Sequence, residues 1–513
     1  MGLSQAGQEE REQPPDTRLC ALVVYCFLAL GIAARLAEYL HYRVLWQDEG
    51  YTGVTIATRS FAEFFQPLGL YQIVAPGYLL FAKLSLLVGG VNEYALRFPS
   101  LMAGLASLVL FAVAVRRWLP GWGGALGFAF FSSAGLLIYY AGEAKPYAQD
   151  VCVALLLWML AAATAQQTTL TLRWCLMLGA AGAAAVWFSF PSCFVLAGIG
   201  AYQLDRCALR RDTPRFLRLL AAYVCWAASF AVLYVLILAP GMNQESDFRG
   251  ESLMETMRSS WSFGFLPFPP TSFADIDQYQ NQFLRLFWNP GGFRLTGLAA
   301  FVWLVGWWSL YQKRPQLFWL LLNPFIVAFA VSLVKLYPFD GRMILFLTPA
   351  LFLVLGEGVA FLYENLTRGR RVVLVLLLLL LLAPATARAA RNIVAPPERF
   401  ELNTALNKAA ANWESGDRLY LGFYDALTFH YCRTWYDFPE EAVLLESAPF
   451  ELQPDDAARL EQIPLEELRG RRLWVAVWHH RDLDGFTALL ESHGGKQLRR
   501  EQLGGPELLL YQF

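Results

Sequence analysis

Long apolar segments separated by short polar loops make up residues 19–387 of the chain. The first runs from Leu19 to about Leu40, close to the roughly twenty residues that a helix needs to cross a bilayer. Further segments of this kind lie at about 95–115, 123–140, 147–165, 174–190, 191–205, 219–238, 295–311, 317–336, 343–363 and 372–387. The pattern predicts an all-α polytopic membrane domain with about eleven transmembrane helices.

The segment between the first two predicted spans has a different character. It extends from His41 to about Tyr94, and it is moderately polar at first and largely apolar from Val74 to Val91. We expect the apolar part to be a helix that lies on the membrane or dips into it. Counting it as a full span would put every later basic loop on the wrong side of the bilayer.

Basic residues collect in loops that fall on one side of the membrane under this count. These loops contain Arg116 and Arg117; Arg206, Arg210, Arg211, Arg215 and Arg218; Lys313 and Arg314; and Arg368, Arg370 and Arg371. Because cytoplasmic loops carry an excess of lysine and arginine, we expect a cytoplasmic amino terminus. Residues 1–18, which are polar and contain proline, are predicted to form a disordered cytoplasmic tail. The first span lacks a convincing cleavage site and is expected to be retained.

From residue 388 the composition becomes that of a soluble domain. Short apolar strands at 418–424, 443–446, 473–478 and 508–513 alternate with helical stretches. They predict a small extracytoplasmic α/β domain over residues 388–513. The pair His479-His480 is interpreted as the surface end of a strand, because no third ligand is spaced to complete a metal site.

Composition agrees with a membrane protein and excludes some functions. Hydrophobic residues make up 56% of the chain and charged residues only 16%, whereas soluble domains usually carry about 25% charged residues. A net charge of -1 gives no support for nucleic-acid binding. The eight cysteines include no C-x-x-C motif, so neither a disulfide framework nor a zinc site is indicated.

Polar residues from separate loops gather on the side opposite the basic loops. They are Asp48 and Glu49, Arg97, Glu143 and Lys145, and Tyr337 and Arg342. Each has a simpler interpretation: the acidic pair could mark the membrane boundary, the arginines could snorkel from span ends, and Glu143 with Lys145 could be a surface ion pair. That several loops contribute to one face favours a site for a lipid-linked phosphate. Cations would bind the phosphate, and a carboxylate would take a proton from an attacking hydroxyl.

Five short stretches, in order, resemble the GT-C superfamily of integral-membrane glycosyltransferases. Leu45-Trp46-Gln47-Asp48-Glu49, after Arg35, is similar to the first external loop of that superfamily, and residues 74–81 (VAPGYLLF) resemble its membrane-surface helix. Residues 92–100 (NEYALRFPS) resemble its entry to the second span. Residues 138–148 (IYYAGEAKPYA) resemble its second external loop, with Lys145 where arginine is usual, and 337–343 (YPFDGRM) resemble a late loop. The nearest branch is the bacterial one of protein-mannosyltransferases, aminoarabinose transferases and lipopolysaccharide galacturonosyltransferases.

The resemblance implies an enzyme of the bacterial inner membrane. It would transfer a sugar, with inversion, from a polyprenyl-phosphate donor to an extracytoplasmic lipid, glycan or protein. Asp48 would be the base, Glu49 its substitute, and Glu143 would orient the acceptor. Arg97, Lys145, Arg342 and Tyr337 would bind the donor phosphate. Branches differ in using a divalent metal ion, so an ion held by Asp48 and Glu143 stays open.

A transporter or flippase for a lipid or small molecule is the alternative function. Transporters often contain internal repeats and ionisable residues near the middle of the bilayer. The two halves of this chain show no repeat, and most charges fall at the ends of the predicted spans. The sequence therefore favours transfer over transport.

Overall fold

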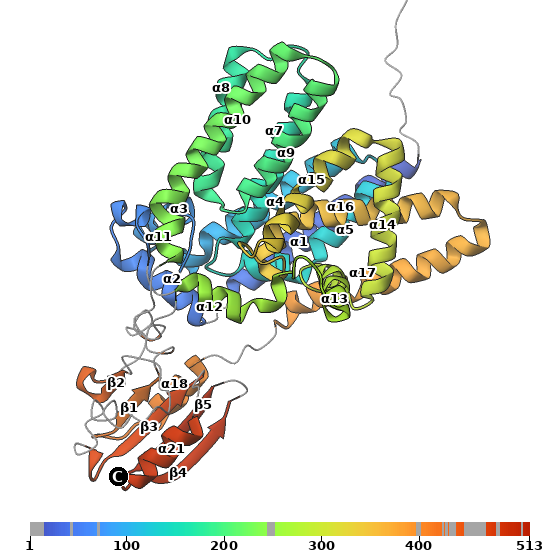
Figure 1. The fold of residues 1–513 in the computed structure, drawn as a ribbon. Coiled ribbons are helices and arrows are strands. Elements are labelled where there is room, and N and C mark those ends of the chain that lie inside the picture. The colour runs from blue at the N-terminus through green and yellow to red at the C-terminus, as the bar shows by residue number, and fades with distance from the viewer. Residues whose placement is uncertain are drawn as a thin grey trace, which may run out of the picture.

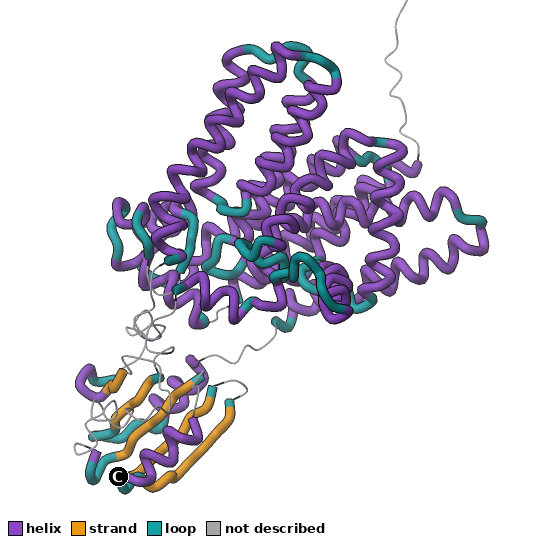
Figure 2. Tube along the Cα trace, in the orientation of Figure 1, coloured by secondary structure: helices purple, strands orange, loops and turns teal. Residues whose placement is uncertain are grey.

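A computed structural model describes residues 15–41, 45–68, 72–243, 252–396, 402–422, 425, 429, 438–445, 468–478, 483–503 and 506–513. A helical domain extends to the end of α17 (Arg368–Val394), and a small α/β domain follows it (Figure 1). The five strands found among the described residues all belong to this second part (Figure 2). The expected combination of a polytopic helical domain with a small α/β domain is confirmed. Residues 1–14 of the predicted tail and His479-His480 lie outside the described residues.

The helical domain contains α-helices joined by short 3-10 and π-helical segments. In chain order its main helices are α1 (Pro15–Leu40), α2 (Gln47–Thr58), α3 (Pro76–Gly89), α4 (Glu93–Trp118), α5 (Trp122–Ser133), α6 (Gly135–Ala141), α7 (Tyr147–Gln166), α8 (Leu172–Phe188), α9 (Ser192–Leu209), α10 (Thr213–Leu233), α11 (Ala239–Met242), α12 (Leu253–Ser260), α13 (Phe273–Trp288), α14 (Thr296–Lys313), α15 (Pro315–Leu333), α16 (Thr348–Asn365) and α17. The shorter segments are η1 (Ala62–Phe65), η2 (Tyr234–Leu238), η3 (Ser262–Gly264) and η4 (Gly341–Leu347).

Each apolar segment that was expected to cross the membrane is helical. Over the described residues, seven helices are long and apolar enough to span a bilayer, or up to eight if the bent pair α5–α6 is one span. The chain is therefore a multi-pass membrane protein. The other expected spans coincide with α8, α9 and α14, which do not meet the same criterion of length and apolarity.

The segment expected at the membrane surface forms α3. This helix has 14 residues and is therefore about 21 Å long, shorter than the roughly 30 Å of a bilayer core. Pro76 occupies its first turn, where the missing N–H costs nothing. Its length agrees with a surface or dipping helix rather than a span.

The break between α5 and α6 exposes a backbone carbonyl that a buried arginine satisfies. The two helices are bent by 53° at Ala134. In α1, the guanidinium of Arg35 is 1% exposed, and its Nη1 donates to the carbonyls of Gly31 (3.1 Å) and Ser132 (3.2 Å). A carbonyl at a helix end needs such a partner when no water is present.

The basic loops meet at one end of the helical domain, which we call the arginine end. Arg117 binds the Gln166 side chain, and Arg215 donates to the carbonyl of Gln167. Arg314 contacts the carbonyl of Trp118, and Lys313 pairs with Glu364. The clustering is the one predicted from the sequence. Because α17 begins at this end and is about 40 Å long, its other terminus lies at the opposite end, before the α/β domain.

The α/β domain is a five-stranded mixed sheet between helices. Its elements are α18 (Leu402–Ala411), β1 (Arg418–Leu421), η6 (Glu440–Ala442), β2 (Val443–Leu445), β3 (Arg472–Val477), α21 (Leu483–Ser492), β4 (Lys496–Gln502) and β5 (Glu507–Gln512). The strand order is β2-β1-β3-β5-β4, with β1 parallel to β2 and β3, and β5 antiparallel to β3 and β4. Along β3, Trp474 packs in the core that contains Leu406 of α18, and Val475 in the core that contains Phe486 of α21.

Glycine allows the innermost helices, α5, α14 and α16, to approach closely. A Cβ added to Gly356 of α16 would lie 2.2 Å from the carbonyl oxygen of Gly123. A Cβ on Gly306 of α14 would lie 2.0 Å from the carbonyl oxygen of Val354. These contacts are with backbone atoms, so a larger side chain can be accommodated only if the helices move apart.

Gly356→Ala is therefore expected to lower the free energy of unfolding by about 1–3 kcal/mol, the usual cost of overpacking. Gly297→Ala, in the first turn of α14 with no atom within 4 Å of the added Cβ, is the matched control and should be neutral or slightly stabilising. Melting temperatures of the purified proteins in detergent measure both. Equal melting temperatures would contradict the close packing.

Candidate active site

The candidate side chains converge at the end of the helical domain opposite the arginine end. They come from the start of α2, from α4, from the loop between α6 and α7, and from η4. Asp48 and Arg342, which are 294 positions apart in the sequence, are thereby in direct contact. Because α7 has 20 residues, this site lies about 30 Å from the arginine end.

Asp48 lies between two cations. One carboxylate oxygen, Oδ1, is 3.8 Å from Nζ of Lys145, and the other, Oδ2, is 3.1 Å from Nη1 of Arg342. Its side chain remains 26% exposed. Burial raises the pKa of the Asp48 carboxyl, but Lys145 and Arg342 together lower it by more, so the net pKa lies below the ordinary value. Asp48 is therefore an ionised and accessible carboxylate at neutral pH.

Lys145 is buried beneath Asp48 and is held by a glutamine. Its Nζ donates to Oε1 of Gln72 at 2.9 Å, and the same oxygen accepts a hydrogen bond from the hydroxyl of Thr52 at 2.9 Å. Burial lowers the pKa of the Lys145 ammonium, and the neighbouring Asp48 only partly offsets this effect. Sequence reasoning missed Gln72, because a single glutamine in a loop carries no recognisable pattern.

Glu49, the next residue, faces inward and is fully buried. Its carboxylate accepts two hydrogen bonds from Arg97, from Nε at 2.8 Å and Nη2 at 2.7 Å. It also accepts one from the backbone amide of Ala144 at 2.7 Å. This bidentate ion pair joins α2, α4 and the loop that carries Lys145. The charged groups of Glu49 and Arg97 are thus directed at each other within the protein.

Arg342 is surrounded by aromatic rings. Its guanidinium carbon lies 5.9 Å from the ring centre of Trp46, 5.5 Å from that of Tyr147 and 5.2 Å from that of Trp261. Such contacts stabilise a partly desolvated cation. Its Nε atom is buried and has no hydrogen-bond partner among the described residues. The guanidinium therefore has a donor available in addition to the group that contacts Asp48.

The loop before Arg342 is held by α13. Both carboxylate oxygens of Asp340 accept hydrogen bonds from Arg285, from Nε at 2.7 Å and Nη2 at 3.1 Å. The hydroxyl of Tyr337 donates to the carbonyl of Met343 at 2.7 Å, and burial raises the pKa of Tyr337 well above its ordinary value. Tyr337 thus remains protonated and closes the loop on itself. No sequence pattern connects Arg285 with this loop.

Glu143 completes the set of predicted residues in the site. It is 0% exposed and adjoins Ala144, whose amide binds Glu49. Its charge acts on Lys145, raising the pKa of that ammonium. The structure therefore brings six of the predicted residues into one cluster: Asp48, Glu49, Arg97, Glu143, Lys145 and Arg342. The seventh, Tyr337, contacts the backbone of the segment that carries Arg342.

The site offers a poor set of ligands for a divalent metal ion. No group of three or more His, Cys, Asp or Glu side chains in the described part of the chain is placed to hold one. Asp48 already contacts two cationic groups, which would repel a third positive charge. The proposed metal ligands Asp48 and Glu143 therefore do not fit such an ion here.

Comparison with known proteins gives structural matches but no sequence matches. No family model and no curated protein sequence matches the chain. A crystal structure of ArnT from Cupriavidus metallidurans in the apo state aligns over 96% of this chain and 98% of that chain, at 13% identity and a TM-score of 0.53. The same protein bound to undecaprenyl phosphate aligns over the same shares, at 13% identity and a TM-score of 0.51.

A third solved structure is the archaeal oligosaccharyltransferase AglB from Archaeoglobus fulgidus, in complex with an inhibitory peptide and a dolichol-phosphate. It aligns over 96% of this chain and 74% of that chain, at 11% identity and a TM-score of 0.50. These similarities extend over nearly the whole chain, so they include the α/β domain as well as the membrane helices. The chain therefore has the fold of the GT-C superfamily of integral-membrane glycosyltransferases.

Proposed function

We propose that the chain transfers a sugar from a polyprenyl-phosphate donor to an extracytoplasmic acceptor, in the bacterial inner membrane and with inversion. The observation that carries the proposal is the contact of one accessible carboxylate, Asp48, with two cations, Lys145 and Arg342. The structures of similar fold that contain undecaprenyl phosphate and dolichol-phosphate support this class of donor. A lipid, a glycan and a protein are all acceptors compatible with the site.

In the proposed reaction, the acceptor oxygen forms a bond to the anomeric carbon of the sugar. The bond from that carbon to the phosphate oxygen breaks, and its electron pair leaves with the lipid phosphate. The acceptor proton passes to Asp48. Attack from the face opposite the phosphate inverts the anomeric centre, through a transition state with oxocarbenium character. Arg342, through its Nε and Nη groups, and Lys145 stabilise the negative charge that develops on the phosphate.

Donor binding would also prepare the base. Without donor, Lys145 and Arg342 are directed at Asp48 and hold its pKa low, which makes it a weak base. A phosphate would compete with Asp48 for these same cations. As their hydrogen bonds pass to the phosphate, the pKa of Asp48 rises toward its ordinary value, so the carboxylate becomes more basic when substrate is present.

We assign different parts to the other predicted residues. Glu49 and Arg97 position the first turn of α2 and the second loop, because their charged groups bind each other. Tyr337 shapes the loop of Arg342 through its bond to the Met343 carbonyl. Glu143 is assigned to orienting the acceptor. The clustering of these groups at one end of the helices supports transfer over the alternative of a transporter, which would place them near mid-membrane.

Asp48→Asn is expected to lower turnover at least about a hundredfold, because the amide cannot accept the acceptor proton. Its melting temperature should fall less than that of Glu49→Gln, since the Asp48 side chain is partly exposed and its shape is retained. The assay is transfer in proteoliposomes offered a panel of labelled polyprenyl-phosphate sugars, with the product class identified. A folded Asp48→Asn protein with near-normal transfer would refute the assignment.

Glu49→Gln is expected to affect stability more than Asp48→Asn does. Leaving the buried Arg97 without its counter-charge is expected to cost about 3–5 kcal/mol of stability, so melting temperature and folded yield should fall. Thermal unfolding in detergent, measured beside Asp48→Asn, separates the two residues. If Glu49→Gln unfolds like the wild type but has lost turnover, Glu49 acts directly in catalysis.

Arg342→Ala is expected to raise the barrier to transfer by about 2–4 kcal/mol, as the loss of a charge-stabilising donor does elsewhere. Arg342→Lys keeps the charge but lacks the Nε donor and should recover only part of the rate. Turnover and competition by free polyprenyl phosphate measure the effect. Arg294→Ala, an exposed arginine before α14, is the control, and unchanged donor affinity and turnover in Arg342→Ala would count against the role of Arg342.

A further inference from the structure

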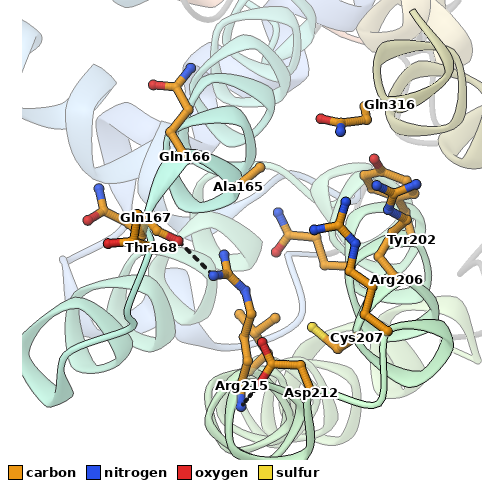
Figure 3. Close-up of a pocket in the computed structure, with 13 residues that line it drawn as sticks. Ala165, Gln166, Gln167, Thr168, Tyr202, Arg206, Cys207, Asp212, Arg215 and Gln316 are labelled. Atoms are coloured by element: carbon orange, nitrogen blue, oxygen red, sulfur yellow. Dashed lines mark hydrogen bonds between the residues drawn. The ribbon is translucent and has the colours of Figure 1, made fainter.

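A cavity of about 350 Å³ lies at the arginine end. Figure 3 shows the residues that line it. It is formed by the last residues of α7 and the loop after them, the last two turns of α9, and the first turns of α10. Helix α7 separates it from the candidate active site by about 30 Å. Nothing in the proposed transfer reaction uses this cavity.

The charge of the cavity is strongly positive. Arg206, Arg210 and Arg215 line it, with Asp212 as the acidic residue among the lining side chains. Asp212 caps α10 by accepting a hydrogen bond from the backbone amide of Arg215 at 3.2 Å. The Asp212 carboxylate therefore caps the start of α10. It forms no ion pair with an arginine in the described part of the chain, so the positive charge of the three arginines is not neutralised.

The three arginines differ in what they bind. Arg215 donates from Nη1 to the carbonyl of Gln167 at 2.7 Å (Figure 3). It also donates from Nη2 to the carbonyl of Thr164 at 2.8 Å, and the two bonds satisfy the end of α7. The guanidinium groups of Arg206 and Arg210 have neither a hydrogen bond nor an ion pair with any residue that the structure describes. Arg206 is half-buried and Arg210 is exposed, so both guanidinium groups are available to a ligand.

The wall beside these arginines is polar and already ordered. Gln203 is 6% exposed, and its Nε2 donates to the carbonyl of Ala161 at 3.0 Å while its Oε1 accepts from the hydroxyl of Tyr223. The Gln166 side chain is held by Arg117. A ligand would therefore enter a preformed space, and it would not have to order these side chains on binding.

We propose that this cavity binds a phosphate group, with Arg206 and Arg210 as its ligands. Guanidinium groups match the geometry of phosphate oxygens and form paired, charge-assisted hydrogen bonds with them. The volume is large enough for a phosphate with a small polar substituent. Basic pockets between the cytoplasmic ends of membrane helices are suited to anionic lipid head groups.

The surroundings are compatible with a lipid as the carrier of the phosphate. On α10, Leu217 and Leu220 are exposed on the same helix that contributes Arg215 to the cavity, and Leu209 of α9 is 74% exposed. Acyl chains could lie against these side chains while the head group occupies the cavity. A soluble phosphorylated molecule has the same head-group chemistry, and the two sources are distinguished by experiment.

The test uses the full-length protein in detergent and the double variant Arg206→Gln/Arg210→Gln. Retention of phosphatidylglycerol is measured by native mass spectrometry during titration, with phosphatidylcholine as the zwitterionic lipid. Inorganic phosphate is added in a parallel titration at constant ionic strength. The double variant should bind phosphatidylglycerol at least about tenfold more weakly, because each charge-assisted hydrogen bond contributes at least that factor.

A matched control removes two charges at the same end without changing the cavity. Arg173→Gln/Arg370→Gln does so at exposed positions and should bind like the wild type. Selective retention of phosphatidylglycerol assigns the phosphate to a lipid, whereas displacement of that lipid by millimolar inorganic phosphate assigns the site to soluble phosphates as well. Equal losses of phosphatidylglycerol in both double variants would overturn the proposal. None of these measurements depends on transferase activity.

Discussion

The buried ion pair between Glu49 and Arg97 is the interaction on which the candidate site depends. It links three segments: the start of α2, the first turns of α4, and the loop between α6 and α7 through the amide of Ala144. A charge pair that has been removed from water stabilises little by itself, but it is strongly destabilising when one partner is lost. The main effect of the Glu49–Arg97 pair is therefore to hold these segments in place. It sets the position of Asp48 relative to Lys145 and Arg342, which lie on other segments.

Two adjacent carboxylates have opposite environments because of helix geometry. Successive residues of an α-helix point about 100° apart, so when Glu49 faces the protein interior, Asp48 must face the side. There it meets two cations and remains accessible. The same division applies to the basic groups: Arg97 is used within the protein, while Arg342 has a donor left over inside a ring of Trp46, Tyr147 and Trp261. In each of these pairs of like residues, one side chain is buried in an ion pair and the other remains available to a ligand.

The sequence predicted the apolar helices of the membrane domain and the side chains that cluster in the candidate site, but not α13 (Phe273–Trp288) nor how those side chains pair. Apolar length was sufficient to locate the spans, because a bilayer demands it. Strand β4 was missed, since Lys496–Gln502 is polar and mostly exposed and shows no apolar alternation. The pairing of Glu49 with Arg97, and not with Lys145, depends on how α2 is rotated against α4. The supporting contacts of Gln72 and Arg285 likewise depend on long-range packing, which no local pattern records.

The break between α5 and α6 has a consequence for the biogenesis of the protein. When α1 first enters the membrane, only the partners within its own helix, such as the carbonyl of Gly31, are available to Arg35. Its second acceptor, the carbonyl of Ser132, is synthesised almost a hundred residues later. The final packing of α1 must therefore wait for the broken helix pair to be inserted.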